Sequence, residues 1–202
     1  MNSEPPARRG GRQRDPAADS AIIEAVLDMV AAGATLSGLS LVAIAKQAGV
    51  SRNSVYRRWK TKDELYLDVL ETINKPRPAP DGAGTREDLA AVLRVLAERV
   101  VDDRAGSMLR ALNAEAVTFP QLHRRYFEEI VASRREAMNR VLRHGVERGE
   151  IRSDVDLDLL ANLLVSPLLA RMASGDTDRL DPEEAGRQII DLVLDGAAAT
   201  PR

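Results

Sequence analysis

The sequence contains no cysteine, and only 3% of its 202 residues are aromatic. Without cysteine the chain can form no disulfide and carry out no thiol chemistry, which suits a reducing compartment. With so few aromatic residues, its core must be built from Leu, Val, Ile and Ala. The basic N-terminus is followed by no apolar segment, and no run approaches the roughly 18 apolar residues of a membrane span. We therefore expect a cytoplasmic protein with no membrane partner and no signal peptide.

The residue patterns of common enzymes and metalloproteins are missing as well. The two histidines, His123 and His144, are too far apart in the chain for a histidine-rich metal motif. There is no glycine-rich phosphate loop and no Gly-x-Ser-x-Gly turn. The many carboxylates fall at helix caps or on polar helix faces, where burial does not tune their pKa values. We predict that the chain is not an enzyme and that it holds no metal and no cofactor.

Charge is unevenly distributed along the chain. Residues 1–62 contain ten Lys and Arg against five Asp and Glu, a balance of +5, although the whole chain carries −2. The remainder must therefore carry −7. Because phosphate contacts act over about a Debye length, a nucleic-acid site needs a basic surface rather than a basic protein. This division favours an N-terminal DNA-binding part joined to an acidic body.

The stretch from Ser40 to Leu65 predicts two short helices around a tight turn. Ser40 and Ser51 can cap the two helices, and Gly49 can adopt the positive φ that ends the first. One apolar stripe of the first helix consists of Leu41, Ile44, Ala45 and Ala48. The outer surface of the second helix is polar and cationic, with Arg52, Asn53, Ser54, Tyr56, Arg57 and Arg58, and Lys60 just beyond. This arrangement is typical of a helix-turn-helix, whose second helix enters the major groove.

Two runs make the pattern more specific. These are Ile-Ala-Lys-Gln-Ala-Gly-Val-Ser and Val-Tyr-Arg-Arg-Trp-Lys-Thr-Lys-Asp-Glu-Leu. Over roughly residues 17–70 the chain resembles the DNA-binding domain of the TetR family of regulators. The resemblance implies that Tyr56 and Lys62 hold DNA phosphates and that Trp59 is the aromatic residue before the next helix. It also implies a C-terminal body that dimerises and binds a small molecule.

Residue chemistry suggests how the contacts with double-stranded DNA divide. Arg52, Asn53 and Arg57 suit base edges, because Arg pairs well with guanine and Asn with adenine. Tyr56, Lys62, Ser40 and Lys46 would mainly position the DNA backbone. The complete set of predicted DNA contacts is Arg8, Arg9, Arg12, Arg14, Ser40, Lys46, Ser51, Arg52, Asn53, Ser54, Tyr56, Arg57, Lys60 and Lys62. The first four lie in an arm that either enters a minor groove or is a solvated tail.

Breaks in the helical pattern predict four segments and an all-α fold of about nine helices. The segments are a flexible basic arm over residues 1–15, a three-helix helix-turn-helix domain with its connecting helix over 16–74, a Pro/Gly-rich loop over 75–84, and a bundle for ligand binding and dimerisation over 85–202. Thr85 and Asp88 predict a capping box at the start of that bundle.

Two C-terminal helices, about 154–172 and 181–194, are apolar on more than one side. Such helices must bury more than one apolar face. The simplest partner for the second face is another subunit related by a two-fold axis. Burial within one chain is the alternative. The resemblance implies a four-helix interface between two copies, for which we predict Leu160, Leu164, Leu168, Ile189 and Val193.

A pocket for a small-molecule effector rests on the resemblance, and pockets between helices are the expected place. Residues that add polar or pliant groups to the aliphatic body are Met108, Asn113, Phe119, His123, Tyr126, Phe127, Asn162 and Met172. Each is more commonly a core or surface residue. We predict a DNA-binding regulator, with repression implied by the resemblance alone. The alternative is a helical interaction module that has lost operator binding and acts through protein partners.

Overall fold

The structure, a computed structural model, describes residues 16–75 and 82–195, and this part of the chain is helical throughout. The elements are α1 (Pro16–Ala31), α2 (Leu41–Gln47), α3 (Arg52–Arg58), α4 (Lys62–Ile73), α5 (Thr85–Val101), α6 (Asp103–Ala114), α7 (Pro120–Arg125), the π-helical segment η1 (Tyr126–Val131), α8 (Ala132–Glu147), α9 (Leu157–Ser174) and α10 (Pro182–Leu194). Because α7, η1 and α8 follow without a break, the described residues form nine helices. The all-α prediction is confirmed.

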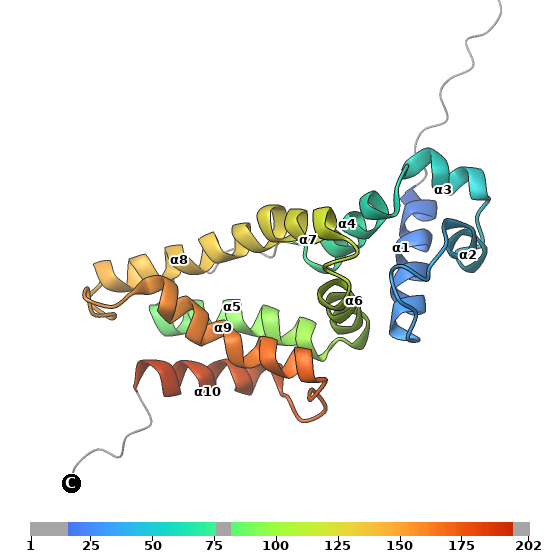
Figure 1. Ribbon diagram of the computed structural model, residues 1–202. Coiled ribbons are helices and arrows are strands. Elements are labelled where there is room, and N and C mark those ends of the chain that lie inside the picture. Colours follow the sequence, from blue (N-terminus) through green and yellow to red (C-terminus); the bar gives the residue numbers. More distant parts are fainter. Residues whose placement is uncertain (1–15, 76–81, 196–202) are drawn as a thin grey trace, which may run out of the picture.

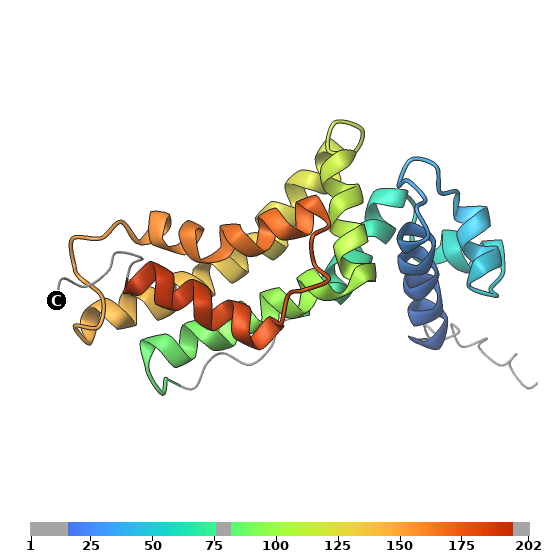
Figure 2. The same ribbon diagram turned by 90° about the horizontal axis from the view of Figure 1, so that it is seen from below.

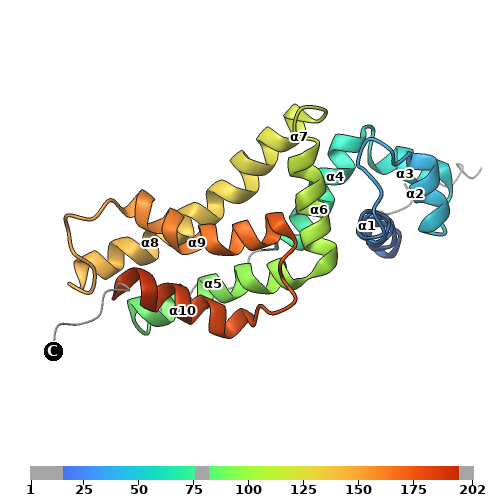
Figure 3. The ribbon, with the colours of Figure 1, turned by 60° about the horizontal axis from the view of Figure 1, so that its bottom comes forward.

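The molecule is elongated, with a small head of α1, α2 and α3 at one end (Figure 1). The continuous helix α7–η1–α8 runs along one side of the body, and α5, α9 and α10 lie on the other. Seen from below, α10 lies beside α5 (Figure 2). The helix α4 leads from the head into the body, and α6 stands between them (Figure 3). The helix α3 thus lies in the head, at the end of the molecule away from the body (Figure 1).

The head forms because its caps and apolar positions agree. The Ser40 hydroxyl accepts a hydrogen bond from the N–H of Ala43 at 3.1 Å, and that of Ser51 from the N–H of Ser54 at 3.2 Å. Gly49 ends α2 with a φ of +67°, a conformation that a Cβ would strain. The head core buries Ile22, Val26, Leu36, Ile44 and Val55 completely. These contacts hold α2 and α3 together around the tight turn that the sequence predicted.

Glu115, which caps the C-terminal end of α6, ties the body to the loop between α1 and α2. Its two carboxylate oxygens accept hydrogen bonds from the N–H groups of Leu36 at 2.6 Å and Ser37 at 2.9 Å. Lys62 donates from Nζ to the carbonyl oxygens of the same two residues, at 3.2 and 2.8 Å. The buried Tyr66 hydroxyl donates to the Leu36 carbonyl at 2.7 Å. Both sides of this loop backbone are therefore held.

This junction should depend on pH. Burial raises the pKa of Glu115, but the hydrogen bonds from Ser37 and Leu36 and the charge of Lys62 outweigh it, so the pKa falls below its ordinary 4.5. A carboxyl whose pKa is lowered on folding stabilises the fold above its unfolded pKa and stops doing so as the pH falls through the folded value. We expect the Leu36 and Ser37 amides to lose hydrogen-exchange protection, as followed by NMR, only when the pH is lowered well below the ordinary carboxyl pKa of 4.5. A Glu115→Gln variant should show no such step, and an identical step in that variant would assign it to other carboxyls.

One cap differs from the sequence prediction. Thr85 is not the N-cap of α5 but its first residue, and Gly84 precedes it without a side-chain cap. Glu150, in the turn after α8, instead accepts a hydrogen bond from the Thr85 N–H at 2.9 Å. Arg148 donates to the Thr85 hydroxyl at 2.9 Å. The predicted capping box is therefore wrong, because a carboxylate distant in sequence caps this helix.

Candidate DNA-binding interface

The helix α3 has one buried and one exposed face. Val55 is fully buried and anchors the helix in the head. Around it, Arg52, Asn53, Tyr56 and Arg57 are exposed, and the Tyr56 side chain retains 42% of its accessible surface. A short helix that is fixed on one side and presents cationic and amide groups on the other has the form of a DNA-recognition helix.

Two of these exposed residues support each other. The guanidinium carbon of Arg52 lies 5.1 Å from the centre of the Tyr56 ring, which is a cation–π distance. Its Nη2 also lies 3.5 Å from the Tyr56 hydroxyl. The two residues are one turn apart, so the helix brings them onto the same face. This contact restricts the rotamers of both side chains before any DNA is bound.

Three other predicted contacts surround α3. Lys46, in the last turn of α2, and Lys60, just after α3, are both exposed. Ser40 is exposed too, but its hydroxyl already caps α2. These residues extend the polar surface of α3 along both of its neighbours. Lys46 and Lys60 are therefore accessible to a partner, whereas the Ser40 hydroxyl is already used within the head.

The structure turns part of the predicted outer surface of α3 inward. The Arg58 side chain is 6% exposed, forms an ion pair with Asp19 of α1 and donates to the Ser54 carbonyl at 3.0 Å. The prediction that Arg58 faces outward is therefore wrong. Ser54 is half-buried, and its hydroxyl lies 2.9 Å from that of Ser51. The only signal in the sequence for this ion pair is Asp19 in the first turn of the facing helix α1.

Lys62, a predicted phosphate contact, also forms hydrogen bonds within the protein. Its ammonium group is half-buried and is shared between the Leu36 and Ser37 carbonyls. An ammonium has three N–H donors, so one is left for a phosphate. The structure thus places Lys62 at the boundary between the head and the body. Arg8, Arg9, Arg12 and Arg14 lie outside the described residues.

Comparison with known proteins decides the family. Residues 30–69 match the model for bacterial regulatory proteins of the tetR family. Residues 79–193, more than half of the chain, match the model for the tetracyclin repressor-like C-terminal domain. The chain belongs to the TetR family. As a member of this family it is a DNA-binding regulator and not an enzyme, as predicted.

Several relatives support this TetR-family assignment. The chain is 26% identical to the uncharacterised regulator YdeS of Bacillus subtilis, over 80% of this chain and 81% of YdeS. It is 28% identical to the DNA-binding transcriptional repressor TetR of Mycobacteroides abscessus, over 77% and 81% of the two chains. The Bacillus subtilis regulator FadR, solved with stearoyl-CoA, superposes with a TM-score of 0.71 at 18% identity, covering 89% of this chain and 99% of FadR. This last likeness shows the fold alone.

In this TetR-family body, the eight predicted effector residues do not form one group. Phe119 is the N-cap of α7, and its ring contacts Tyr66 of α4. His123, Tyr126 and Phe127 follow along α7 and η1, and the ring centres of His123 and Phe127 lie 4.7 Å apart. The other four, Met108, Asn113, Asn162 and Met172, are dispersed: both methionines are buried in the core, and both asparagines are exposed. Only the aromatic residues of α7 and η1 remain together as a candidate binding group.

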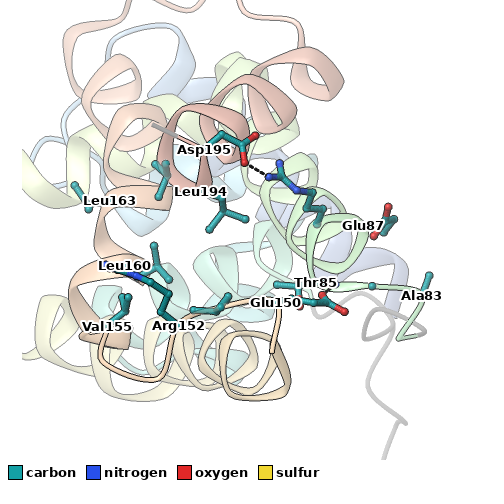
Figure 4. Close-up of a pocket in the computed structure, with 14 residues that line it drawn as sticks. Ala83, Thr85, Glu87, Glu150, Arg152, Val155, Leu160, Leu163, Leu194 and Asp195 are labelled. Carbon is teal, nitrogen blue, oxygen red and sulfur yellow. Dashed lines mark hydrogen bonds and ion pairs between the residues drawn. The ribbon is translucent and has the colours of Figure 1, made fainter. Parts of the chain in front are cut away.

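A cavity of about 680 Å³ is lined instead by residues from the start of α5, the turn between α8 and α9, α9 and the end of α10 (Figure 4). In Figure 1 the start of α5, the turn between α8 and α9 and the end of α10 lie at the end of the body opposite the head. Its lining residues are Ala83, Gly84, Thr85, Arg86, Glu87, Glu150, Ile151, Arg152, Val155, Leu160, Leu163, Val193, Leu194 and Asp195. None of the eight predicted effector residues lines it. Leu160, Leu163 and Leu194 contribute to an apolar wall, whereas Arg86 is paired with both Asp191 and Asp195. The lining therefore combines an apolar wall with five charged residues, which are Arg86, Glu87, Glu150, Arg152 and Asp195.

The predicted dimer residues need a correction. Leu160, Leu164 and Leu168 are at most 6% exposed within a single chain, because α9 packs them against its own body. They cannot form a surface between subunits. The exposed large apolar side chains of the last two helices are Leu159, Leu163, Leu169 and Leu192. Ile189 and Val193 are half-buried and adjoin this surface.

The helix α9 also has the length and composition of a membrane-spanning helix. With 18 residues and a mean hydropathy of 1.3, α9 is long and apolar enough to cross a membrane by length and composition, and only 28% of it is buried. A soluble helix that packs on both faces meets the same criteria. Since α9 carries its buried leucines on one face and its exposed leucines on another, a second protein surface would complete its burial.

Proposed function

We propose that this TetR-family regulator is a cytoplasmic repressor that binds a near-palindromic operator as a homodimer and is released by a small-molecule effector. The exposed cationic face of α3, anchored by the buried Val55, carries the proposal. Two such helices related by a two-fold axis would enter successive major grooves, so the operator would consist of two inverted half-sites. Repression is supported by the Mycobacteroides abscessus relative, which is a repressor.

The proposed contacts divide by chemistry. Arg52, Asn53 and Arg57 are exposed side chains that can reach base edges and provide sequence specificity. Tyr56, Lys46 and the third donor of Lys62 would bind phosphates and set the register of the head. The arginines of residues 1–15 would add minor-groove contacts from an arm whose sequence is strongly basic.

The homodimer is supported by the exposed leucines of α9 and α10. Exposed large apolar side chains concentrated on two neighbouring helices mark an association surface. In a two-fold dimer the same surface serves both subunits, which gives four helices at the interface. The two heads would then lie on one side of the assembly.

The effector is proposed to bind in the C-terminal body. FadR, whose fold this chain shares, holds stearoyl-CoA, so such a body can hold a small molecule. The aromatic group of α7 and η1 and the distal cavity are the two candidate positions. In either position the effector must bind one arrangement of the heads better than the other, since equal affinity for both would shift nothing.

A selection of random duplexes by the purified protein, followed by salt titration of the winner, tests the proposal. We expect a near-palindromic winner, bound by two copies of the chain, whose logarithmic salt slope is about −0.9 for each phosphate neutralised. Selection of no duplex by a folded dimer would contradict operator binding. That result would favour the alternative of an interaction module that acts through protein partners.

A further inference from the structure

The helix α6 is fastened to the DNA-binding head at both of its ends. It stands between the head and the body, with α1 on one side (Figures 2 and 3). Arg104 belongs to its first turn, and Glu115 is its C-cap. A helix of 12 residues is roughly 18 Å long, so the two fastening points are well separated.

At the N-terminal end, Arg104 bridges two carboxylates of α1. Its Nη2 lies 2.6 Å from a carboxylate oxygen of Glu24 and 3.0 Å from one of Asp28. The same nitrogen donates to the Glu24 carbonyl at 3.1 Å. Glu24 and Asp28 are one helical turn apart, so the guanidinium grips the side of α1. These groups are largely exposed, so their ion pairs contribute little to the stability of the fold.

At the C-terminal end, Glu115 grips backbone rather than side chains. Both oxygens of its carboxylate accept from the loop amides of Leu36 and Ser37, which connect α1 to the helix-turn-helix. Lys62 and Tyr66 of α4 hold the carbonyl groups of this loop from the other side. The Tyr66 ring packs edge-on against Phe119, at 5.9 Å between ring centres. The loop is thus held by both α6 and the connecting helix.

If α6 contacted the head at one end only, the head could rotate about that contact. Two separated contacts, by Arg104 and by Glu115, oppose this rotation. We propose that Arg104 and Glu115 are positioning residues that fix the angle of the head to the body and thereby set the half-site spacing that the dimer accepts. This inference rests on the proposed homodimer and its two-half-site operator. A stiff connection concentrates the second head at one distance from the first, and a looser one spreads it over several distances.

The test compares operators whose two half-sites are moved apart or together by one and two base pairs. For the wild type we expect a sharp optimum in affinity at one spacing. In an Arg104→Gln, Glu115→Gln double variant, the ratio between the best spacing and its neighbours should fall by about five- to tenfold. Glu128→Gln and Arg143→Gln are the controls, because they change exposed charges on η1 and α8 and should leave the spacing profile unchanged.

A variant that merely destabilised the fold would lower affinity at every spacing by the same factor, and that result would overturn the inference. An unchanged spacing profile in the double variant would overturn it too. Glu115→Ala provides a second variant in which no side-chain acceptor remains, with circular dichroism to verify the fold. It should flatten the profile at least as much as Glu115→Gln does.

Hydrogen exchange on the free protein separates this inference from the proposed function. In Glu115→Ala the Leu36 and Ser37 amides should exchange about tenfold faster than in the wild type, whereas amides of the distant α10 should not change. If the wild type selects no operator but this acceleration is observed, the proposed operator binding is wrong. The conclusion that Glu115 holds the loop of Leu36 and Ser37 is then still supported. If neither amide exchanges faster, the fastening itself is wrong.

Discussion

An Arg57→Ala variant is expected to lose roughly 1–3 kcal/mol of operator affinity for each half-site and to relax specificity at one base pair of each half-site. Arg57 is exposed in the last turn of α3, and its guanidinium can form two parallel hydrogen bonds with a guanine. The fold should be unaffected, because Val55 and not Arg57 anchors the helix. Competition binding against duplexes that carry each of the four base pairs at every operator position measures the loss.

Lys46→Ala is the matched comparison. Lys46 is exposed on the neighbouring helix and is proposed to bind phosphate, so its removal should weaken all sequences about equally. It should reduce the salt slope by about 1 for each subunit, which is about 2 for the dimer. If Arg57→Ala also weakened all sequences equally, Arg57 would be reassigned to the DNA backbone. Arg143→Ala, on the exposed surface of α8, should change neither quantity.

A Leu163→Asp variant is expected to dissociate the homodimer and to reduce operator affinity far more than any single base contact does. The Leu163 side chain is 50% exposed on α9, within the proposed association surface. In a dimer the substitution would bury an unpaired carboxylate twice, once in each subunit, and an unpaired buried charge is strongly destabilising. Sedimentation velocity gives the oligomeric state, and titration with the full operator and with a half-site gives the affinity.

The control for this variant is Val117→Asp. Val117 is 94% exposed in the turn between α6 and α7, far along the chain from α9 and α10. The Val117→Asp substitution introduces the same charge at an exposed apolar position and should leave the dimer intact. A Leu163→Asp protein that remained dimeric would contradict the proposed surface. An unaltered unfolding transition of the dissociated variant would show that the chain folds by itself.

Local sequence determined the head of this protein. The hydroxyls of Ser40 and Ser51, the glycine between them and the helical spacing of the apolar residues act over one to four residues. Each of these signals therefore predicts the same local structure whatever the rest of the fold is. The exposed side of α3 follows from the same spacing, and so Arg52, Asn53, Tyr56 and Arg57 could all be identified as surface residues.

The choice between partners distant in sequence was decided only by the tertiary structure. Nothing near Arg58 shows that it turns toward Asp19, and no local pattern joins Glu115 to Leu36 or Glu150 to Thr85. These contacts depend on helix packing, which brings a carboxylate beside backbone N–H groups or beside a guanidinium of another helix.

The same distinction applies to the last two helices. Composition showed that α9 is apolar on more than one side, but Leu160, Leu164 and Leu168 could not be told from Leu159 and Leu163 without knowing which side faces the body. Sequence by itself thus determined the family, the helices and most of the exposed side of α3. Tertiary packing decided which leucines remain exposed and which charges hold the head, because both depend on neighbours supplied by other helices.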